Sequence, residues 1–411
     1  MKTLTLNIFV FLISLFITNF SEAQWVQIYG PIGYNFRCFA INGSNIFAGN
    51  YNQGVFLSTD NGDTWTPINN GLSTDVMSLT LNGGYLFAGT NNNGIYRTDN
   101  SGISWTQLNT GESTFNALLG SDAYLFAGEN GQGVFVSTNN GTSWAPANNG
   151  LTNTFIYALA SSPNAGGGMN LFAGTGNDGI FRSTNFGNDW TAGNGIVNLW
   201  TWCLAAAQDG SGNIFAGTDG GVFISSDNGS NWNVVNNGLT KIVVYAMVTK
   251  GSNIFAGTKF GGIFLSTNNG VNWTSINSDF SDHVLSLGVN DDYLFAGIAG
   301  GGRIFRRPLS EILTSLEPIF NGLPSEFKLE QNFPNPFNSS CAIKYSIPKS
   351  SQVTLKIYNT LGEEIEILVN EEKPIGTYEL TWNAANLPSG VYFYRLQTGS
   401  FVQIKKMILL K

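Results

Sequence analysis

A four-residue phrase, Ile or Leu followed by Phe-Ala-Gly, returns at nearly regular intervals through most of this chain. Its phenylalanines follow one another at steps of 40, 39, 46, 43, 40 and 40 residues, and they are Phe47, Phe87, Phe126, Phe172, Phe215, Phe255 and Phe295. Self-similarity at a period of about 40 residues is typical of stacked repeats, in which each unit covers the hydrophobic face of its neighbour. The sequence therefore says much about architecture and little about a ligand.

Each repeat unit has the pattern of four short β-strands. In the second unit they are residues 76–81, 85–88, 94–97 and 105–108, and turns rich in Gly, Asn and Ser separate them. The composition agrees, because 50 residues are Gly and only 11% are charged, against roughly 25% in an average globular protein. Four antiparallel strands in about 40 residues predict the blade of a β-propeller, and hence an all-β fold.

A second phrase recurs between the third and fourth strands of six units. In the first unit it runs from Ser58 to Trp65 with Asp60 and Gly62 inside it, and the tryptophans of the other five are Trp105, Trp144, Trp190, Trp232 and Trp273. The pattern Ser/Thr-x-Asp/Asn-x-Gly-x-x-Trp resembles the Asp-box, or BNR, repeat. Its Ser and Asp side chains can bond nearby backbone amides, its Gly relieves a turn position of positive φ, and its Trp is expected to pack against the next blade. We therefore expect a structural role for it.

The seventh unit lacks this phrase, because Arg306-Arg307-Pro308 stands where it should begin. The missing strand is at the other end of the chain, where residues 25–28 match the fourth-strand pattern of residues 65–68. An N-terminal strand beside residues 303–306 would close the ring without an exposed edge. We predict a propeller of seven blades over residues 24–308.

The first 23 residues have the features of a secretory signal peptide. Lys2 supplies a positive start, residues 8–17 are apolar, and a small-x-small cleavage site ends at Ala23. A retained membrane anchor is disfavoured, because the apolar run is shorter than the ~20 residues that a spanning helix needs. No later segment is long and apolar enough, so we expect no transmembrane span in the mature chain. Residues 309–326, with two prolines, are expected to be a linker.

Beyond the linker the period ends, and alternating segments predict a small antiparallel β-sandwich over residues 327–411. Several phrases stand here in order: Phe333-Pro334-Asn335-Pro336-Phe337-Asn338, then residues 387–396 around Gly390, then a closing stretch with Lys405 and Lys406. With these residues the tail resembles the type A C-terminal sorting domain of the type IX secretion system of Bacteroidetes-type bacteria. The resemblance implies passage through the periplasm, the type IX machinery as a partner, and a secreted or outer cell-surface location.

Charge, histidine and cysteine usage narrow the function classes. The net charge is −8 with no basic stripe, so we expect no nucleic-acid partner. One histidine and no close cysteine pair indicate no metal site, and we expect no cofactor. Cys38 and Cys203 hold the same small-residue position in non-adjacent units, too far apart for a disulfide. We expect these two and Cys341 to be buried free thiols.

A glycan-active enzyme is the first alternative, since sialidases and glycosidases carry Asp boxes. The turn between the third and fourth strands lies opposite the interblade connections, so the box carboxylates should face away from the binding mouth. A sialidase-like site needs clustered arginines, yet the propeller's arginines hold positions that do not converge: Arg37, Arg97, Arg182, Arg303, Arg306 and Arg307. Hydrolysis of a glycosidic bond needs two facing carboxyl groups. The candidates on the connection face share no motif, and we expect them to be solvated turn residues: Asp75, Glu112, Glu129, Asp178, Asp219 and Asp282.

One column of positions, near the start of the first strand of each unit, varies while the scaffold repeats. The predicted ligand contacts in it are Phe155, Tyr157, Trp200, Trp202 and Tyr245 in blades four to six, and Arg37 in blade one. Aromatic rings at a concave mouth can stack on sugar rings or grip a peptide. The alternative is that these rings fill space between blades. The lone His283 stands in the same column, and we expect a surface or mouth residue there.

The repeat style of the propeller resembles the photosystem II stability/assembly factor group and sortilin-like propellers, which are not enzymes. Fold does not dictate function, so this resemblance is an analogy only. We predict a secreted or cell-surface binding or adhesion module, a monomer, whose ligand is a glycan or a protein. A glycan-active enzyme and a purely structural surface protein are the alternatives.

Overall fold

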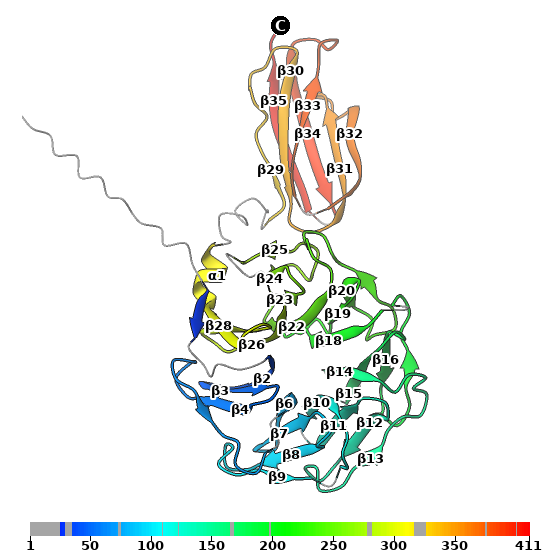
Figure 1. The fold of residues 1–411 in the computed structure, drawn as a ribbon. Coiled ribbons are helices and arrows are strands. Elements are labelled where there is room, and N and C mark those ends of the chain that lie inside the picture. The colour runs from blue at the N-terminus through cyan, green and yellow to red at the C-terminus, as the bar shows by residue number, and fades with distance from the viewer. Residues whose placement is uncertain are drawn as a thin grey trace, which may run out of the picture. The chain divides into compact units, whose positions relative to one another are not determined.

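The computed structural model describes residues 25–28, 35–72, 75–108, 110–121, 123–164, 168–196, 199–277, 282–315, 326–374, 376–399 and 401–411. The expected signal peptide and most of the expected linker lie outside these described residues. The chain divides between Ile312 and Leu313 into two compact units. Among the described residues, the regular structure is β apart from one helix, α1 (Leu309–Ser315), as Figure 1 shows.

Seven four-stranded antiparallel sheets make up the first unit, and each is one blade. The first blade contains β2 (Phe36–Asn42), β3 (Asn45–Asn50), β4 (Gly54–Ser58) and β5 (Thr66–Pro67). The second contains β6 (Val76–Asn82), β7 (Tyr85–Thr90), β8 (Ile95–Thr98) and β9 (Thr106–Gln107). The third contains β10 (Phe115–Ser121), β11 (Tyr124–Glu129), β12 (Gly133–Ser137) and β13 (Ala145–Pro146). The fourth contains β14 (Ile156–Pro163), β15 (Met169–Thr175), β16 (Ile180–Ser183) and β17 (Thr191–Ala192).

The remaining three blades follow the same plan. The fifth contains β18 (Thr201–Ala206), β19 (Ile214–Thr218), β20 (Gly221–Ser225) and β21 (Asn233–Val234). The sixth contains β22 (Val244–Lys250), β23 (Asn253–Thr258), β24 (Gly262–Ser266) and β25 (Thr274–Ser275). The seventh contains β26 (Val284–Val289), β27 (Tyr293–Ile298), β28 (Arg303–Pro308) and the N-terminal β1 (Val26–Ile28).

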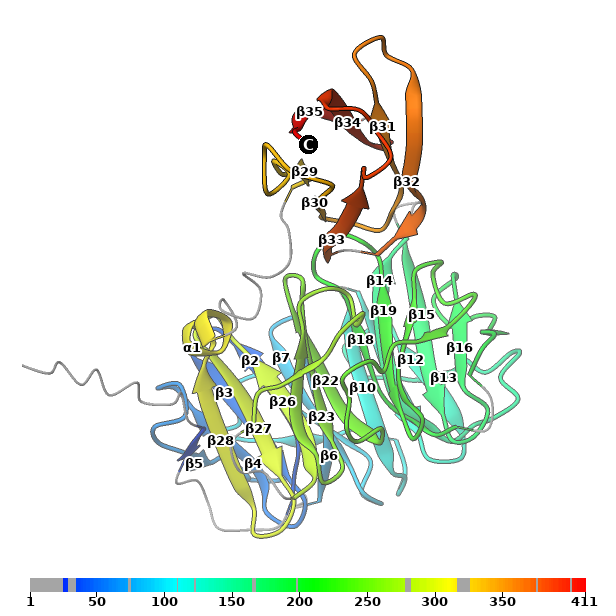
Figure 2. The same ribbon diagram turned by 90° about the horizontal axis from the view of Figure 1, so that it is seen from above.

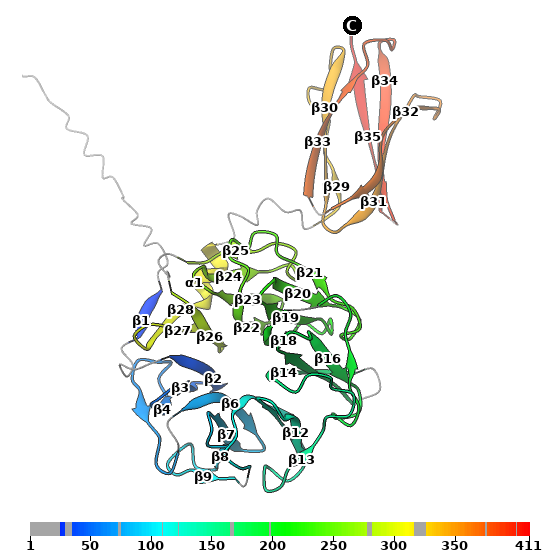
Figure 3. The ribbon, with the colours of Figure 1, turned by 45° about the vertical axis from the view of Figure 1, so that its right-hand side comes forward.

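The ring of blades is closed. The first strands, which Figures 1 and 3 show nearest the centre, contact one another in the order β2, β6, β10, β14, β18, β22, β26 and back to β2. Figure 2 shows the blades from the side. β1 pairs antiparallel with β28, with Val26 opposite Arg306 and Ile28 opposite Ile304, as Figure 3 shows. This is the closure that the sequence predicts. The predicted fold class, a seven-bladed propeller followed by a β-sandwich, is confirmed.

The Phe-Ala-Gly phrase forms the second strand of each blade, where the Phe and Ala of all seven copies are buried. Its Gly is required by close packing, because a Cβ on Gly217 would lie 2.7 Å from Cγ1 of Val244 in the next blade. Opposite this Gly stands a small residue, Cys203. Burial raises the pKa of the Cys38 and Cys203 thiols to about 12, so neither is a ready nucleophile. All three cysteines are free; as whole residues, Cys38 and Cys203 are only partly buried, while Cys341 is buried as expected.

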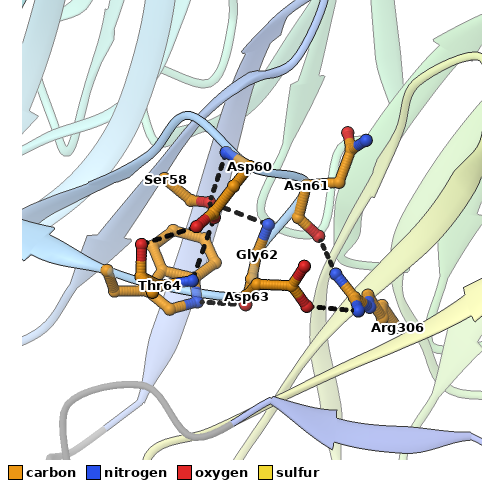
Figure 4. A network of polar contacts seen from close by, with 8 residues as sticks. Ser58, Asp60, Asn61, Gly62, Asp63, Thr64 and Arg306 are labelled. Carbon is orange, nitrogen blue, oxygen red and sulfur yellow. Dashed lines mark hydrogen bonds and ion pairs between the residues drawn. The ribbon is translucent and has the colours of Figure 1, made fainter.

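The six turns that carry the second phrase, hereafter the box turns, share one hydrogen-bond pattern, shown for blade one in Figure 4. The hydroxyl Oγ of Ser58 donates to Oδ1 of Asp60 at 2.7 Å and accepts from the amide of Gly62 at 2.7 Å. The carboxylate of Asp60 accepts from the amide and hydroxyl of Thr64 at 2.9 and 2.6 Å. These bonds, led by the Thr64 hydroxyl, lower the pKa of Asp60 to about 2. The carboxylate of Asp60 thus holds the two ends of the turn together through hydrogen bonds.

The tryptophans of the box turns pack against the preceding blade, so the expectation of packing on the next blade is wrong. Trp105 in blade two donates its indole N–H to the carbonyl oxygen of Ile68 in blade one at 2.6 Å, and Trp190 and Trp273 repeat this bond to Ala147 and Val235. The reason is that the start of the fourth strand contacts the previous blade, where the amide of Trp105 donates to the carbonyl oxygen of Asn70 at 2.9 Å. Trp232 is buried as well, whereas Trp65 and Trp144 are only half-buried.

Three arginines join neighbouring blades on the side of the box turns. Arg97, Arg182 and Arg306 hold one position in the third strand, opposite Phe87, Phe172 and Phe295. Each donates to a backbone carbonyl in the box turn of the next blade, those of Asn140, Asn228 and Asn61. Arg306 also forms an ion pair with Asp63 at 2.5 Å, which joins blade seven to blade one (Figure 4). These arginines share a column, but they do not converge on one site.

The expected linker begins as ordered structure. Residues 309–315 form α1, in which Ile312 is fully buried and Leu309 donates its amide to the carbonyl oxygen of Asp292 at 2.8 Å. The apolar residues Leu309 and Ile312 lie three apart, on one face of the helix, and this spacing explains the burial. The sequence interpretation missed this helix because it is only two turns long.

The second unit is a sandwich of two sheets. One sheet has the order β29 (Lys328–Leu329), β30 (Ser340–Ile347), β33 (Gly376–Asn383). The other has the order β32 (Glu364–Lys373), β31 (Ser351–Tyr358), β34 (Gly390–Thr398), β35 (Phe401–Leu409). Both sheets contribute fully buried residues to one core, among them Tyr345 and Tyr394. Figure 3 shows the two sheets facing each other.

The residues predicted as the sorting signal lie at one end of this sandwich and along its last strand. Phe337 is buried against Trp382, and its backbone exchanges hydrogen bonds with Ile408 and Leu410. The preceding Pro334, Asn335 and Pro336 are exposed, although Oδ1 of Asn335 accepts from the Ile408 amide at 2.9 Å. Gly390 pairs with Leu409 at the end of β35, Lys405 is partly buried and Lys406 is exposed.

Candidate functional site

The innermost strand of every blade carries a β-bulge at the same point. In β2 the register passes from Phe36 opposite Asn50 to Cys38 opposite Gly49, so Arg37 is the extra residue. The equivalent extra residues of the other six blades are Met77, Asn116, Tyr157, Trp202, Tyr245 and Leu285. A bulge leaves one residue outside the ladder and re-aims its side chain. Seven bulges in register therefore present one variable side chain per blade.

These seven side chains line one cavity of ≈ 410 Å³, together with His283. The volume falls within the roughly 300–1,000 Å³ that is common for small-molecule sites. The strand starts and the turns between second and third strands surround it, while the box turns lie at the other ends of the strands. The expectation that the box turns face away from the mouth agrees with this arrangement.

Four of the predicted ligand contacts form a continuous group of rings across blades four to six. Trp200 stacks on Trp202 with centroids 5.1 Å apart, and Tyr157 meets both rings at 4.9 and 5.4 Å. Tyr245 lies edge-on to Trp202 at 5.4 Å. We call Tyr157, Trp200, Trp202 and Tyr245 the aromatic wall. All four are only partly buried, and Tyr157, Trp202 and Tyr245 line the cavity.

A hydrogen bond holds one ring of the aromatic wall in place. The indole Nε1 of Trp202 donates to Oδ1 of Asp219 at 2.7 Å, which fixes the orientation of the ring. Burial raises the pKa of the Tyr157 hydroxyl.

Phe155, another predicted ligand contact, does not belong to the wall: it is 50% exposed, does not line the cavity, and lies at the rim beside Asn130. Trp200 also lies outside the lining, behind Tyr157 and Trp202, whose rings it contacts.

Two rings, one from blade six and one from blade seven, extend the wall. His283 stacks on Tyr245 at 5.8 Å with planes 7° apart, and Phe260 meets His283 edge-on at 4.1 Å. The sequence interpretation placed His283 at the mouth but missed Phe260. Phe260 occupies a turn between second and third strands with φ of 58°, and it is 54% exposed. The sequence signal for Phe260 was an aromatic residue at a turn position where other units have Asn or Gly.

The carboxylates of the connection face are engaged in local contacts rather than paired across the cavity. Asp219 holds Trp202, Asp282 forms an ion pair with Arg303 at 2.5 Å, and buried Glu129 accepts from the Gln132 amide at 2.5 Å. Asp75 is partly buried, and Glu112 and Asp178 are exposed. None of the described residues that line the cavity is a carboxylate. In the described part of the chain, no three His, Cys, Asp or Glu residues stand close enough to hold a metal ion.

Fold and site together define a seven-bladed β-propeller with a variable central cavity, followed by a small β-sandwich. The sandwich is a secretion system C-terminal sorting domain, since residues 331–410 match that family. A sorting domain of this kind implies secretion or an outer cell-surface location. Among the described residues, no helix is long and apolar enough to cross a membrane.

Solved structures similar to this chain are β-propellers. YCF48 from Cyanidioschyzon merolae is 14% identical with a TM-score of 0.52, and the match covers 70% of this chain and 99% of that one. YCF48 bound to D1 peptide has a TM-score of 0.56 at 14% identity, covering 69% and 96%. A GH74 enzyme from Niastella koreensis has a TM-score of 0.57 at 17% identity, covering 79% and 59%. These identities show the fold alone. No curated protein matches this chain.

Proposed function

We propose that this exported propeller is a binding module that takes its ligand in the central cavity, against the aromatic wall. The observation that carries the proposal is the set of seven bulges in register, which turns the variable residues of the repeat toward one cavity. The neighbouring second strand has Phe, Ala and Gly in every blade, whereas the bulged residue differs between blades. Recognition sites vary in this way on repeated scaffolds.

The chemistry of the wall supports stacking as the mode of binding. Tyr and Trp rings that are held in place and partly exposed bind flat apolar surfaces at little entropic cost. The hydrogen bond from Trp202 to Asp219 holds one such ring before any ligand arrives. A glycan or a protein segment entering the cavity would meet this preorganised surface.

A glycan-active enzyme is the second candidate, and the fold similarity to GH74 enzymes is the observation that favours it. That similarity is at the level of the fold. Hydrolysis by the common mechanisms needs two carboxyl groups about 5 to 9.5 Å apart across the scissile bond. The described cavity lining supplies no such pair, so binding without turnover is the better-supported function.

The test uses the full chain on arrays of glycans and peptides, with release of reducing sugar measured in parallel. We expect binding to at least one class of probe, loss of that binding in Trp202→Ala, and no release of sugar. Val234→Ala is the matched control, because Val234 is a 58% exposed apolar residue on β21, away from the cavity. If folded Trp202→Ala protein still binds the probe, the proposal that the ligand binds in the cavity is wrong.

A further inference from the structure

Arg37 differs from every other residue that lines the cavity, because it alone carries a permanent positive charge. Its guanidinium lies over the ring of Tyr51, 5.2 Å from the centroid. None of the ion pairs found among the described residues includes Arg37. Two carboxylates of this face already have partners, since Asp282 pairs with Arg303 and Asp219 accepts from Trp202. The guanidinium is therefore available to an anion in the cavity.

The ring of blades places Arg37 across the cavity from the aromatic wall. β2 in blade one contacts the first strands of blades two and seven, so blades four and five are the most distant from it around a ring of seven. Tyr157 and Trp202 are the bulged residues of those two blades. One molecule filling the ≈ 410 Å³ cavity would thus have rings on one side and a guanidinium on the other.

One backbone carbonyl of each blade near the mouth already has a hydrogen-bond donor within the propeller. In each blade the carbonyl oxygen two residues before the bulge already accepts an amide hydrogen from the end of the second strand; in blades one, four and five these bonds are Tyr51 to Asn35, Gly176 to Phe155 and Asp219 to Trp200. The amide of the Asn116 side chain is also used, because its Nδ2 donates to the carbonyl oxygen of Ile156 at 3.1 Å. The aromatic ring faces and the guanidinium of Arg37 are thus among the groups in this cavity that a ligand can contact.

We infer that the cavity binds an acidic sugar, with a pyranose ring of a uronic acid residue on the aromatic wall and its carboxylate on Arg37. The inference rests on the proposed function and narrows it. The apolar face of a pyranose suits Trp and Tyr rings, and a planar carboxylate accepts two parallel hydrogen bonds from a guanidinium. Stacking on Tyr51 holds the guanidinium toward the cavity at a low entropic cost.

The test compares acid and neutral forms of one ligand. Trimers of galacturonate and of mannuronate are titrated into the full chain by calorimetry, beside their methyl esters, which keep the ring and remove the charge. We expect one acid trimer to bind and its ester to bind at least about tenfold more weakly. Arg37→Gln should weaken binding of the acid by about 10- to 100-fold and leave that of the ester unchanged. Raised salt should weaken binding of the acid only.

Lys250→Gln is the matched control, because it removes the same charge from the propeller at the far end of β22, where Lys250 pairs with exposed Asp291. It should bind as the unaltered chain does, and melting curves confirm that each variant is folded. Equal binding of acid and ester, or no effect of Arg37→Gln, overturns the acidic-sugar inference. If a peptide alone binds and Trp202→Ala abolishes it, the inference fails while the proposed function stands. If Trp202→Ala leaves binding of every probe intact, the proposed function fails too.

Discussion

The indole Nε1 of Trp25 donates a hydrogen bond of 2.9 Å to the carbonyl oxygen of Ile276, which lies 251 positions further along the chain. The same bond joins Trp273 to Val235 one blade earlier. Trp25 is therefore the fourth-strand tryptophan of blade seven, supplied by the other end of the chain. The guanidinium of Arg307 donates to the same Ile276 oxygen at 2.8 Å, so both ends of the propeller meet on one carbonyl.

Removing the Trp25 side chain should open the ring. Trp25 is 9% exposed and sits on the strand that covers the edge of β28. We expect Trp25→Ala to cost ~3 to 5 kcal/mol of unfolding free energy, and deletion of residues 24–29 to cost more. Denaturant unfolding measures both. Val26→Ala, on a side chain 53% exposed in the same strand, should change little; an unchanged midpoint for Trp25→Ala would contradict the closure argument.

Trp105 and Trp202 should have opposite roles. Trp105 is 6% exposed between blades one and two, so Trp105→Ala should cost ~3 to 5 kcal/mol of stability while the folded fraction binds normally. Trp202→Ala, at the cavity, should weaken binding by ~1 to 3 kcal/mol with a smaller loss of stability. Thermal melting and a binding titration on both variants separate the roles. If Trp202→Ala destabilises as much as Trp105→Ala and the folded fraction binds normally, the wall is packing between blades.

Acid should weaken the box turn of blade one through Asp60. Its folded-state pKa is lowered to about 2, chiefly by the Thr64 hydroxyl. A depressed carboxyl pKa contributes stability that is present above the unfolded-state value of about 3.9 and is lost as pH falls toward 2. Asp60→Asn, the residue type of four other box turns, should lack this part of the pH dependence. Melting temperatures from pH 5 to pH 2 measure the difference, and parallel curves for the two proteins would refute it.

The sorting domain calls for a milder variant than truncation. Deleting the last ten residues would remove most of β35, including the fully buried Met407 and Leu409, and so would unfold the sandwich as well as remove the signal. The double substitution Lys405→Gln and Lys406→Gln changes charge on an edge strand and leaves that core intact. We expect the variant to accumulate in the periplasm, measured by fractionation of cells. Normal export of a folded double variant would show that these lysines are not part of the signal.

Much of this architecture can be predicted from short sequence patterns. The Phe-Ala-Gly phrase marks a strand that two neighbouring blades bury, and the box turn is closed by bonds between residues no more than four positions apart. Such local features recur with each copy of the phrase. Counting the Phe-Ala-Gly strands and the tryptophan strands therefore predicted the number of blades and the closing role of Trp25. The same reasoning located the variable column that contains Arg37, Tyr157 and Trp202.

Which side chains face one another across the cavity was determined by the tertiary structure. Only the register of β2 against β3 shows that Arg37 is a bulged residue, because a bulge is a property of a strand pair and not of one strand. Only the closed ring brings Arg37 to face Tyr157 and Trp202 and leaves Phe155 on the rim. The tertiary structure was also needed to show that Trp105 packs on the preceding blade. It was needed as well to show that three arginines, Arg97, Arg182 and Arg306, bond to the next blade. Each of these contacts joins residues far apart in the chain, where a local pattern specifies a side chain but not its partner.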